Sequence, residues 1–472
     1  MRRAVLIVAG ACLLAAPTVL AFYSGGYFAQ PRLIAGIVIW ALVLVVAAVG
    51  PAPLPSSTPG RLALAGLVAL TAWSALSILW APQGGPAIQN VQRLVLYVGA
   101  LLLAVGTLRE AGLRRAVEPA LAAGTAIVIG YGLAGRVLPD LITLASSRSA
   151  LGRLEQPLTY WNAEGALAAL GLVLCARLAG DAGRPRAMRL IAAALAPVLA
   201  AGLYLSYSRG ALAVGVLGLL VLAALAPSRA QLHAAAVVLV SGACVAVVAE
   251  LLPRSREGIT LLAALIVAGA ASAFLVARTG AEPSAAPGWY SRLRPVAWAA
   301  TALVAAGLLV GGIAERPSKR ELSSGAGAGR LTSVSSNRYE YWRVALNAFR
   351  DDPLVGAGSG GFRVVWLQER PIRETVRDTH SLEFEVAAEL GLVGLLALAL
   401  MCGGMIVTAR RALAGQGAVA AGAAAALVVW FLHASIDWDW EMPAVTLPAL
   451  VLTGLLITQA EGGRVPEADD LR

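Results

Sequence analysis

Residues 190–226 read LIAAALAPVLAAGLYLSYSRGALAVGVLGLLVLAALA, two apolar runs separated only by a short polar break that contains Arg209. A membrane-spanning helix needs about 20 mostly apolar residues, and each run approaches that length. The runs lack the two-residue alternation of a membrane-spanning strand and are rich in alanine, leucine and glycine, which suit close helix packing in lipid. This stretch predicts two membrane helices joined by a tight turn.

Apolar runs of this kind recur along the whole chain. The 472 residues are 58% hydrophobic and 14% charged, with a mean hydropathy of +0.75, which is outside the usual makeup of soluble domains. We therefore expect an all-α fold, a polytopic transmembrane helix bundle of about 12–14 spans. The predicted spans lie near residues 4–22, 33–50, 62–80, 93–108, 116–137, 162–179, 190–207, 211–226, 231–252, 258–277, 296–314, 386–408, 415–436 and 443–459.

Three compositional features narrow the class of protein further. The first run follows two arginines and is interpreted as a retained signal anchor. The net charge of +10 is scattered over short loops without a dense basic run, so we expect no nucleic-acid partner. The cysteines lack the spacing of a metal site or a disulfide framework and are interpreted as packing residues; they are Cys12, Cys175, Cys244 and Cys402.

The distribution of basic residues predicts the orientation in the membrane. With a cytoplasmic N-terminus, eighteen Lys and Arg residues fall in inside segments and eight in short outside segments. Eleven more lie in the long polar loop. They are left out of this comparison because long loops translocate largely regardless of charge. We therefore predict a multi-pass protein of the inner (plasma) membrane, with both termini cytoplasmic and the long loop extracytoplasmic.

This topology divides the chain into four parts. Residues 1–314 are expected to form a bundle of about eleven spans, and residues 315–385 the long extracytoplasmic loop with short helices and the catalytic residues. Residues 386–460 are expected to form the C-terminal spans and residues 461–472 a cytoplasmic tail. For a site on this side we expect lipid-linked diphosphates as substrates, and not ATP or nucleotide sugars.

The long loop is the only long polar segment of the chain and carries the main candidate residues. Residues 337–350 have helical spacing and contain Arg338 and Trp342, and Gly356 and Gly358 follow in a turn whose backbone amides can bind an anion. His380 precedes the next span, where Ser381 is expected to cap the helix. A histidine there can accept a proton from a hydroxyl group; the alternative is an ordinary interfacial histidine.

Arg209 is the second candidate, because it lies between two spans with almost no loop to hold it in water. A charge at membrane depth costs about 3 kcal/mol on insertion scales and marks a functional position by default. A guanidinium group forks onto phosphate oxygens, so Arg209 is a candidate diphosphate ligand, with the neighbouring Tyr207 as a substrate contact. The alternative is an arginine that snorkels to the lipid headgroups.

Two other outside loops carry aromatic and polar residues. Arg153, Tyr160 and Asn162 are interpreted either as part of an interfacial belt or as contacts to a sugar or headgroup. His433 and Asp437 are four residues apart and share a helical face. A metal site there is conceivable, but a capped helix end with belt tryptophans is preferred, with sugar stacking on Trp438 or Trp440 as a further option.

Three motifs together resemble the O-antigen ligase and O-antigen polymerase superfamily, which are bacterial envelope glycosyltransferases of cell-surface polysaccharide biosynthesis. They are Ser208-Arg209-Gly210 at a span end, Arg338 and Trp342 ahead of Pro353-Leu354-Val355-Gly356-Ala357-Gly358, and His380-Ser381 ahead of Glu389-Leu390-Gly391. Their order, the long outside loop and the many spans also agree. The resemblance covers roughly the second half of the chain.

The resemblance implies transfer of a glycan from an undecaprenyl-diphosphate carrier to an acceptor hydroxyl, with inversion and without a cofactor or metal. The acceptor would be a glycan, a lipid or a protein. Arg209 and Arg338 would hold the diphosphate and stabilise the leaving group, and His380 would be the general base. The expected substrate-binding residues are Arg153, Tyr160, Asn162, Tyr207, Trp342, Gly356 and Gly358.

Two functions of other classes remain alternatives. A transporter or flippase of lipid-linked glycans would line the middle of the bundle with polar residues and show internal inverted repeats. A non-catalytic envelope assembly protein would tolerate the loss of His380. The clustering of charged residues at one membrane face disfavours transport.

Overall fold

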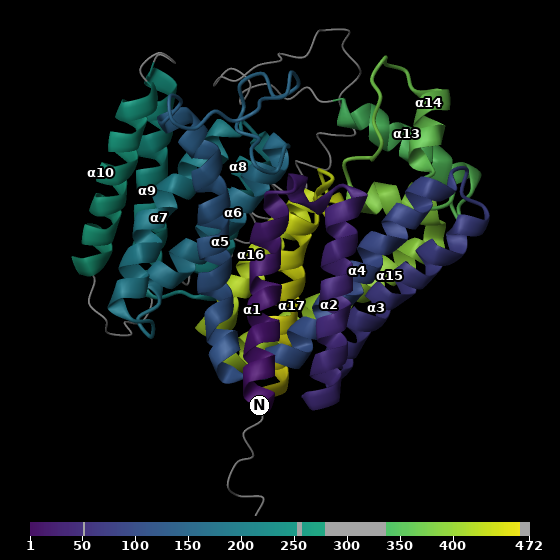
Figure 1. The fold of residues 1–472 in the computed structure, drawn as a ribbon, viewed down its shortest axis with the longest axis horizontal. Helices are drawn as coiled ribbons and strands as arrows, with labels where there is room; N and C mark the ends of the chain where they lie inside the picture. The colour runs from purple at the N-terminus through teal and green to yellow at the C-terminus, as the bar shows by residue number, and fades with distance from the viewer. Residues whose placement is uncertain (51, 253–256, 279–336, 463–472) are drawn as a thin grey trace, which may run out of the picture.

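The computed structural model describes residues 1–50, 52–252, 257–278 and 337–462. Within these ranges the regular elements are helices and no β-strand occurs, which confirms the all-α prediction (Figure 1). Eleven of the described helices are long and apolar enough to cross a membrane.

Thirteen of the predicted spans coincide with described helices, and the predicted span at residues 296–314 lies outside the described residues. The helices α8 and α16 are shorter, with 17 residues each. The bounds are α1 (Arg2–Ala21), α2 (Ala29–Val49), α3 (Thr58–Leu76), α4 (Gly84–Thr107), α5 (Ala111–Val137), α6 (Trp161–Gly180), α7 (Arg186–Leu205), α8 (Arg209–Leu225), α9 (Arg229–Leu251), α10 (Glu257–Arg278), α15 (Leu382–Gln416), α16 (Ala418–Ala434) and α17 (Pro443–Gly462).

Two short helices, α13 (Arg338–Asp351) and α14 (Phe362–Glu369), lie at one end of the bundle, beside the first turns of α4 and α15 (Figure 1). Consecutive helices run in opposite directions, so this end also carries the connections at residues 22–28, 77–83, 138–160, 206–208 and 435–442. We call it the loop end. Every candidate residue from the sequence lies at this end of the bundle.

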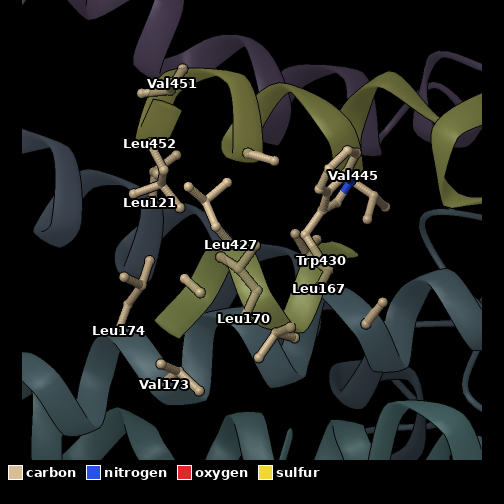
Figure 2. Close-up of a cluster of buried hydrophobic side chains, with 14 of the residues drawn as sticks. Leu121, Leu167, Leu170, Val173, Leu174, Leu427, Trp430, Val445, Val451 and Leu452 are labelled. Atoms are coloured by element: carbon tan, nitrogen blue, oxygen red, sulfur yellow. The ribbon is translucent and has the colours of Figure 1, made fainter. Parts of the chain in front are cut away.

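The core of the bundle is apolar through its middle. Helix α6 is buried along its whole length and packs against α5, α16 and α17 through leucine and valine side chains around Trp430 (Figure 2). Alanine and glycine let these helices approach closely, as is usual where lipid supplies no hydrophobic drive for association.

Helix α15 is broken at Gly391, whose φ is +62°, a left-handed value that favours glycine. The break frees carbonyl groups that the segment 353–358 satisfies: Ala357 N donates to Ala388 O at 2.9 Å and Gly358 N to Glu389 O at 2.8 Å. Beyond the break, Leu392 N donates to Pro353 O at 2.8 Å. The long loop is thereby fixed against α15.

Helices α3 and α15 pack with their backbones almost in contact. A Cβ atom on Gly66 would collide with the backbone nitrogen of Met401, and one on Gly404 with the backbone nitrogen of Ala63. Gly403, in contrast, has no heavy atom within 4 Å of its Cβ position.

We expect Gly66→Ala to destabilise the protein by about 1–3 kcal/mol, because the added methyl group can fit only if α3 and α15 separate. Gly403→Ala is the matched control on the same pair of helices and should be neutral or slightly stabilising. Thermal unfolding of the purified protein in detergent measures the difference. Equal unfolding temperatures for the two variants would contradict the close approach of these helices.

Candidate active site

The carboxylate of Asp437, in the connection between α16 and α17, joins three segments of the loop end. Its Oδ1 accepts hydrogen bonds from the Tyr160 hydroxyl at 2.8 Å and from the Trp438 backbone nitrogen at 2.9 Å. Its Oδ2 accepts a hydrogen bond from Nη2 of Arg338. The side chain is fully buried, so these partners replace the water that an isolated carboxylate would need.

Asp437 stays ionised in this environment. Burial alone would raise the pKa of its carboxyl group, but the positive charge of Arg338 and the hydrogen bond from Tyr160 help to outweigh burial, and this pKa lies below the ordinary value. A fixed negative charge therefore lies between the guanidinium group of Arg338 and the histidine rings.

Tyr160 and Asn162 lie at the start of α6 and belong to the hydrogen-bond network of Asp437. Asn162 Nδ2 donates to the Tyr160 hydroxyl at 2.7 Å, and that hydroxyl in turn donates to Asp437. The Tyr160 ring lies 4.4 Å from the Trp438 ring, and both Tyr160 and Asn162 are buried. The structure brings the two predicted residues together as supports of Asp437 and Trp438.

Arg338 and Trp342 lie one turn apart on α13. Arg338 is partly exposed, with 23% of its side chain accessible, so the side chain that Asp437 orients is not fully enclosed by the protein. The Trp342 ring is buried and stacks on Phe384 at 5.3 Å. In the described structure, therefore, Trp342 joins α13 to the start of α15.

His380 has a left-handed backbone, with φ +57°, an uncommon conformation for a residue other than glycine. Its ring lies 5.2 Å from that of Tyr341 and 6.2 Å from that of Trp438. Nδ1 lies 3.1 Å from the backbone oxygen of Asp378. A carbonyl oxygen only accepts hydrogen bonds, so Nδ1 carries the proton and Nε2 of the neutral ring has the lone pair.

The surroundings of His380 favour its neutral form. Burial lowers the pKa of the imidazole below its ordinary value; Asp437 opposes this effect, and Arg338 adds to it. The next residue, Ser381, caps α15 by accepting a hydrogen bond from Phe384 N at 3.4 Å, as the sequence predicts. His380 is therefore a neutral, partly buried proton acceptor on a fixed backbone.

Arg209 is the first residue of α8, and Ser208 caps that helix by accepting from Ala211 N at 3.3 Å. The following residue, Gly210, packs against Ile436 and His433. The start of α8 thus lies beside the connection that carries Asp437. Tyr207 turns toward α9, where its hydroxyl lies 3.5 Å from Glu250.

Arg153 is occupied within its own loop. Its Nε donates to Ala150 O at 2.7 Å and its Nη2 to Ser149 O at 2.6 Å, and its guanidinium group stacks 3.7 Å from the ring centre of Trp161. The Trp161 ring in turn lies 5.1 Å from Tyr160. Arg153 therefore stabilises the loop that leads into α6.

The glycine-rich turn binds an anion, but this anion is a side chain of the protein. The Glu389 carboxylate accepts from Gly360 N at 2.7 Å and from Phe362 N at 3.2 Å. Gly356 and Gly358 have φ of +68° and +84°, and their amides donate to backbone oxygens. Their observed role is to place the turn against α15.

A second polar cluster lies beside the first and was not predicted from the sequence. Arg93 on α4 forms a buried ion pair with Glu441, with one N–O distance of 2.7 Å. Carboxylate oxygens of Asp378, Glu385 and Glu441 lie within 4.8 Å of one another, a donor set that suits a hard divalent cation. Burial, followed by the charge of Glu441, raises the pKa of Asp378 to about 7.

Sequence reasoning missed the role of Asp437, which it weighed only as a metal ligand. It also missed Arg93, Glu441 and Asp378. Arg93 could have been found by the argument used for Arg209, that an ionisable residue within an apolar run marks a functional position. Arg93 lies at the edge of such a run.

Residues 192–399 match the family described as O-antigen ligase. The matched segment begins in α7 and ends in α15, and it contains Arg209, Arg338 and His380. Asp437 and Tyr160 lie outside it. No curated protein matches the chain.

We predict that His380 titrates below its ordinary pKa and that the two neighbouring charges move it in opposite directions. Asp437→Asn should lower the pKa further, because the imidazolium loses a negative neighbour, and Arg338→Gln should raise it. Titration of ¹³C-labelled histidine by NMR measures this, and the chain has only three histidines to assign. Shifts of the same sign in both variants would contradict the placement of His380 between these charges.

Proposed function

We infer that this membrane protein, whose residues 192–399 form an O-antigen ligase family domain, transfers a glycan from an undecaprenyl-diphosphate carrier to an acceptor hydroxyl outside the cytoplasm. The family itself implies a glycan-transfer enzyme with lipid-linked glycan substrates in polysaccharide biosynthesis. The observation that carries the specific proposal is the arrangement at the loop end. There, a neutral histidine, a guanidinium group oriented by a buried carboxylate and the start of α8 with Arg209 lie around one short connection.

In this proposal His380 is the general base. Its Nε2 accepts the proton of the acceptor hydroxyl while the oxygen attacks the anomeric carbon of the donor sugar. The bond between that carbon and the diphosphate oxygen breaks, and the undecaprenyl diphosphate leaves with the bonding electron pair. A single displacement of this kind inverts the anomeric configuration.

Arg338 and Arg209 are proposed to stabilise the negative charge that develops on the departing diphosphate. Asp437 fixes Arg338 from the protein side, so the guanidinium group is oriented before the donor binds. Tyr160 and Asn162 act through Asp437, and we propose them as positioning residues. Arg153, Tyr207, Trp342, Gly356 and Gly358 stay proposals as substrate contacts.

The distribution of polar groups supports transfer over transport. A transporter binds its substrate near the middle of the membrane, between polar or broken helices. The middle of this bundle between α5, α6, α16 and α17 is filled with leucine, valine and tryptophan side chains (Figure 2), while the network around Asp437 lies at one end.

The side of the membrane is also part of the proposal. The excess of arginine in the short loops at the opposite end supports cytoplasmic termini, with the segment 315–385 as the extracytoplasmic loop. The carrier-linked glycan would meet the site on the outer face of the plasma membrane.

We expect His380→Ala to reduce transfer at least about 100-fold, the usual contribution of a general base. Arg338→Gln and Arg209→Gln should reduce it by about 100-fold or more through lost stabilisation of the leaving group. The assay is glycan transfer in proteoliposomes with a lipid-linked oligosaccharide and a panel of glycan, lipid and peptide acceptors.

Two matched controls separate chemistry from folding. Arg343→Gln changes an arginine on the same helix as Arg338 that is 53% exposed and paired with Glu340, and His233→Ala changes a histidine at the opposite end. Both variants should retain transfer. Undiminished transfer by His380→Ala would overturn the assignment of the base, and no transfer by the wild-type protein would move the function to transport or assembly.

The proposed mechanism needs no divalent cation, because guanidinium groups take the role of the metal. We therefore expect transfer to continue at an unchanged rate after treatment with EDTA. The opposite result would be a loss of activity on chelation that Mg²⁺ or Mn²⁺ restores in the wild-type protein but not in Asp378→Asn. That result would assign an essential cation to the carboxylates of Asp378, Glu385 and Glu441.

A further inference from the structure

A polar cavity lies beside the loop that carries His380, and none of the steps proposed above uses it. Its volume is about 230 Å³, whereas one water molecule takes up about 30 Å³ of liquid, so it has room for a substituted sugar ring. We call it the arginine pocket. Its charged and aromatic lining includes Tyr27, Arg32, Arg93, Arg363, Arg377 and Asp378.

Arg32, in the first turn of α2, has hydrogen-bond donors without acceptors in this pocket. The residue is only 2% exposed. Its Nη1 donates to the backbone oxygen of Tyr27 at 2.7 Å, but Nε and Nη2 have no partner among the described residues. Buried charged donors without acceptors are costly, so they point to an acceptor that a ligand supplies.

Two of the three carboxylates that line the pocket already have hydrogen-bond partners within the protein. Glu441 is paired with Arg93 at 2.7 Å. Glu389 is held by the backbone amides of Gly360 and Phe362.

The arginines of the lining outnumber its carboxylates by one. They are Arg32, Arg93, Arg363 and Arg377, against Asp378, Glu389 and Glu441, and the carboxylate of Glu385 lies close to those of Asp378 and Glu441. A ligand group with anionic oxygen acceptors would satisfy the remaining donors of Arg32.

The pocket and the proposed base share a wall. The backbone oxygen of Asp378, which lines the pocket, accepts the hydrogen bond from His380 Nδ1 at 3.1 Å. The Trp438 ring lies near both: its centroid is 5.2 Å from that of Tyr27, which lines the pocket, and 6.2 Å from that of His380. A saccharide stacked on Trp438 can therefore extend from the base into the pocket.

We propose that the arginine pocket binds a carboxylate or phosphate group of the acceptor saccharide, with Arg32 as its principal ligand. The assignment to the acceptor rests on the proposed function, in which His380 contacts the acceptor hydroxyl and Arg338 and Arg209 hold the donor diphosphate. The pocket then selects anionic acceptors over neutral ones.

Ligand binding to the full chain in lipid nanodiscs tests this proposal without requiring turnover. The probes are glucuronate, glucose 1-phosphate and glucose, measured by NMR or calorimetric titration. We expect the two anionic probes to bind more tightly than glucose and Arg32→Gln to weaken their binding about tenfold or more, as expected for loss of charged hydrogen bonds. Arg377→Gln, at an exposed position, should weaken it less.

Arg189→Gln is the matched control. Arg189 is likewise a buried arginine in the first turn of a helix, donates from Nε to Ala179 O at 3.1 Å, and lies at the opposite end of the bundle. Its variant should bind the anionic probes as the wild-type protein does. Equal binding of glucuronate and glucose, or equal binding by the wild-type protein and Arg32→Gln, would overturn the proposal that this pocket binds an anionic group.

Competition separates the two sources of an anionic group. Undecaprenyl diphosphate should leave glucuronate bound if the pocket serves the acceptor; displacement of glucuronate would assign the pocket to the donor diphosphate and overturn the acceptor assignment. Because the titrations measure binding without turnover, failure of the transfer assay and failure of this inference are distinguishable.

Discussion

The buried ion pair between Asp437 and Arg338 is the interaction on which the loop end depends. Burying a carboxylate costs several kcal/mol unless charge and hydrogen bonds compensate for it. Here the compensation comes from three separate segments: α13 through Arg338, the entry to α6 through Tyr160, and the local backbone at Trp438. Loss of Arg338 would leave the buried carboxylate without its counter-charge, and loss of Tyr160 would leave it with one hydrogen bond fewer, so the segments hold their relative positions together.

This arrangement explains how residues far apart in the sequence form one site. Arg338 lies 99 residues before Asp437, and Tyr160 lies 277 residues before it. Trp438 then adds an aromatic face between Tyr160, Tyr27 and His380. The proposed catalytic groups and the arginine pocket are consequently two sides of one short connection.

The fold was largely predictable because a spanning helix has a local signature. Apolar runs such as residues 190–226 depend only on composition over about 20 residues, and the described helices follow them closely. The cap at Ser381 was predictable for the same reason, since the capping residue and the helix are adjacent in sequence. The partners of buried charges were not predictable, because a pair such as Arg93 and Glu441 depends on which segments are neighbours in space. The glycine-rich turn shows the same limit: its pattern indicated an anion, but only the structure identifies Glu389 as that anion.

The break in α15 also fixes how deep the long loop reaches. Gly391 lies nine residues after the start of α15, which is roughly 14 Å along the helix axis, within the candidate span Leu382–Gly415. A helix can be interrupted at such a depth only where other protein groups satisfy its backbone, and residues 353–358 do so here. Residues 353–358 therefore lie deeper in the bundle than the first residues of α15. A substitution that displaced this segment would leave polar backbone groups of α15 without partners among apolar helices.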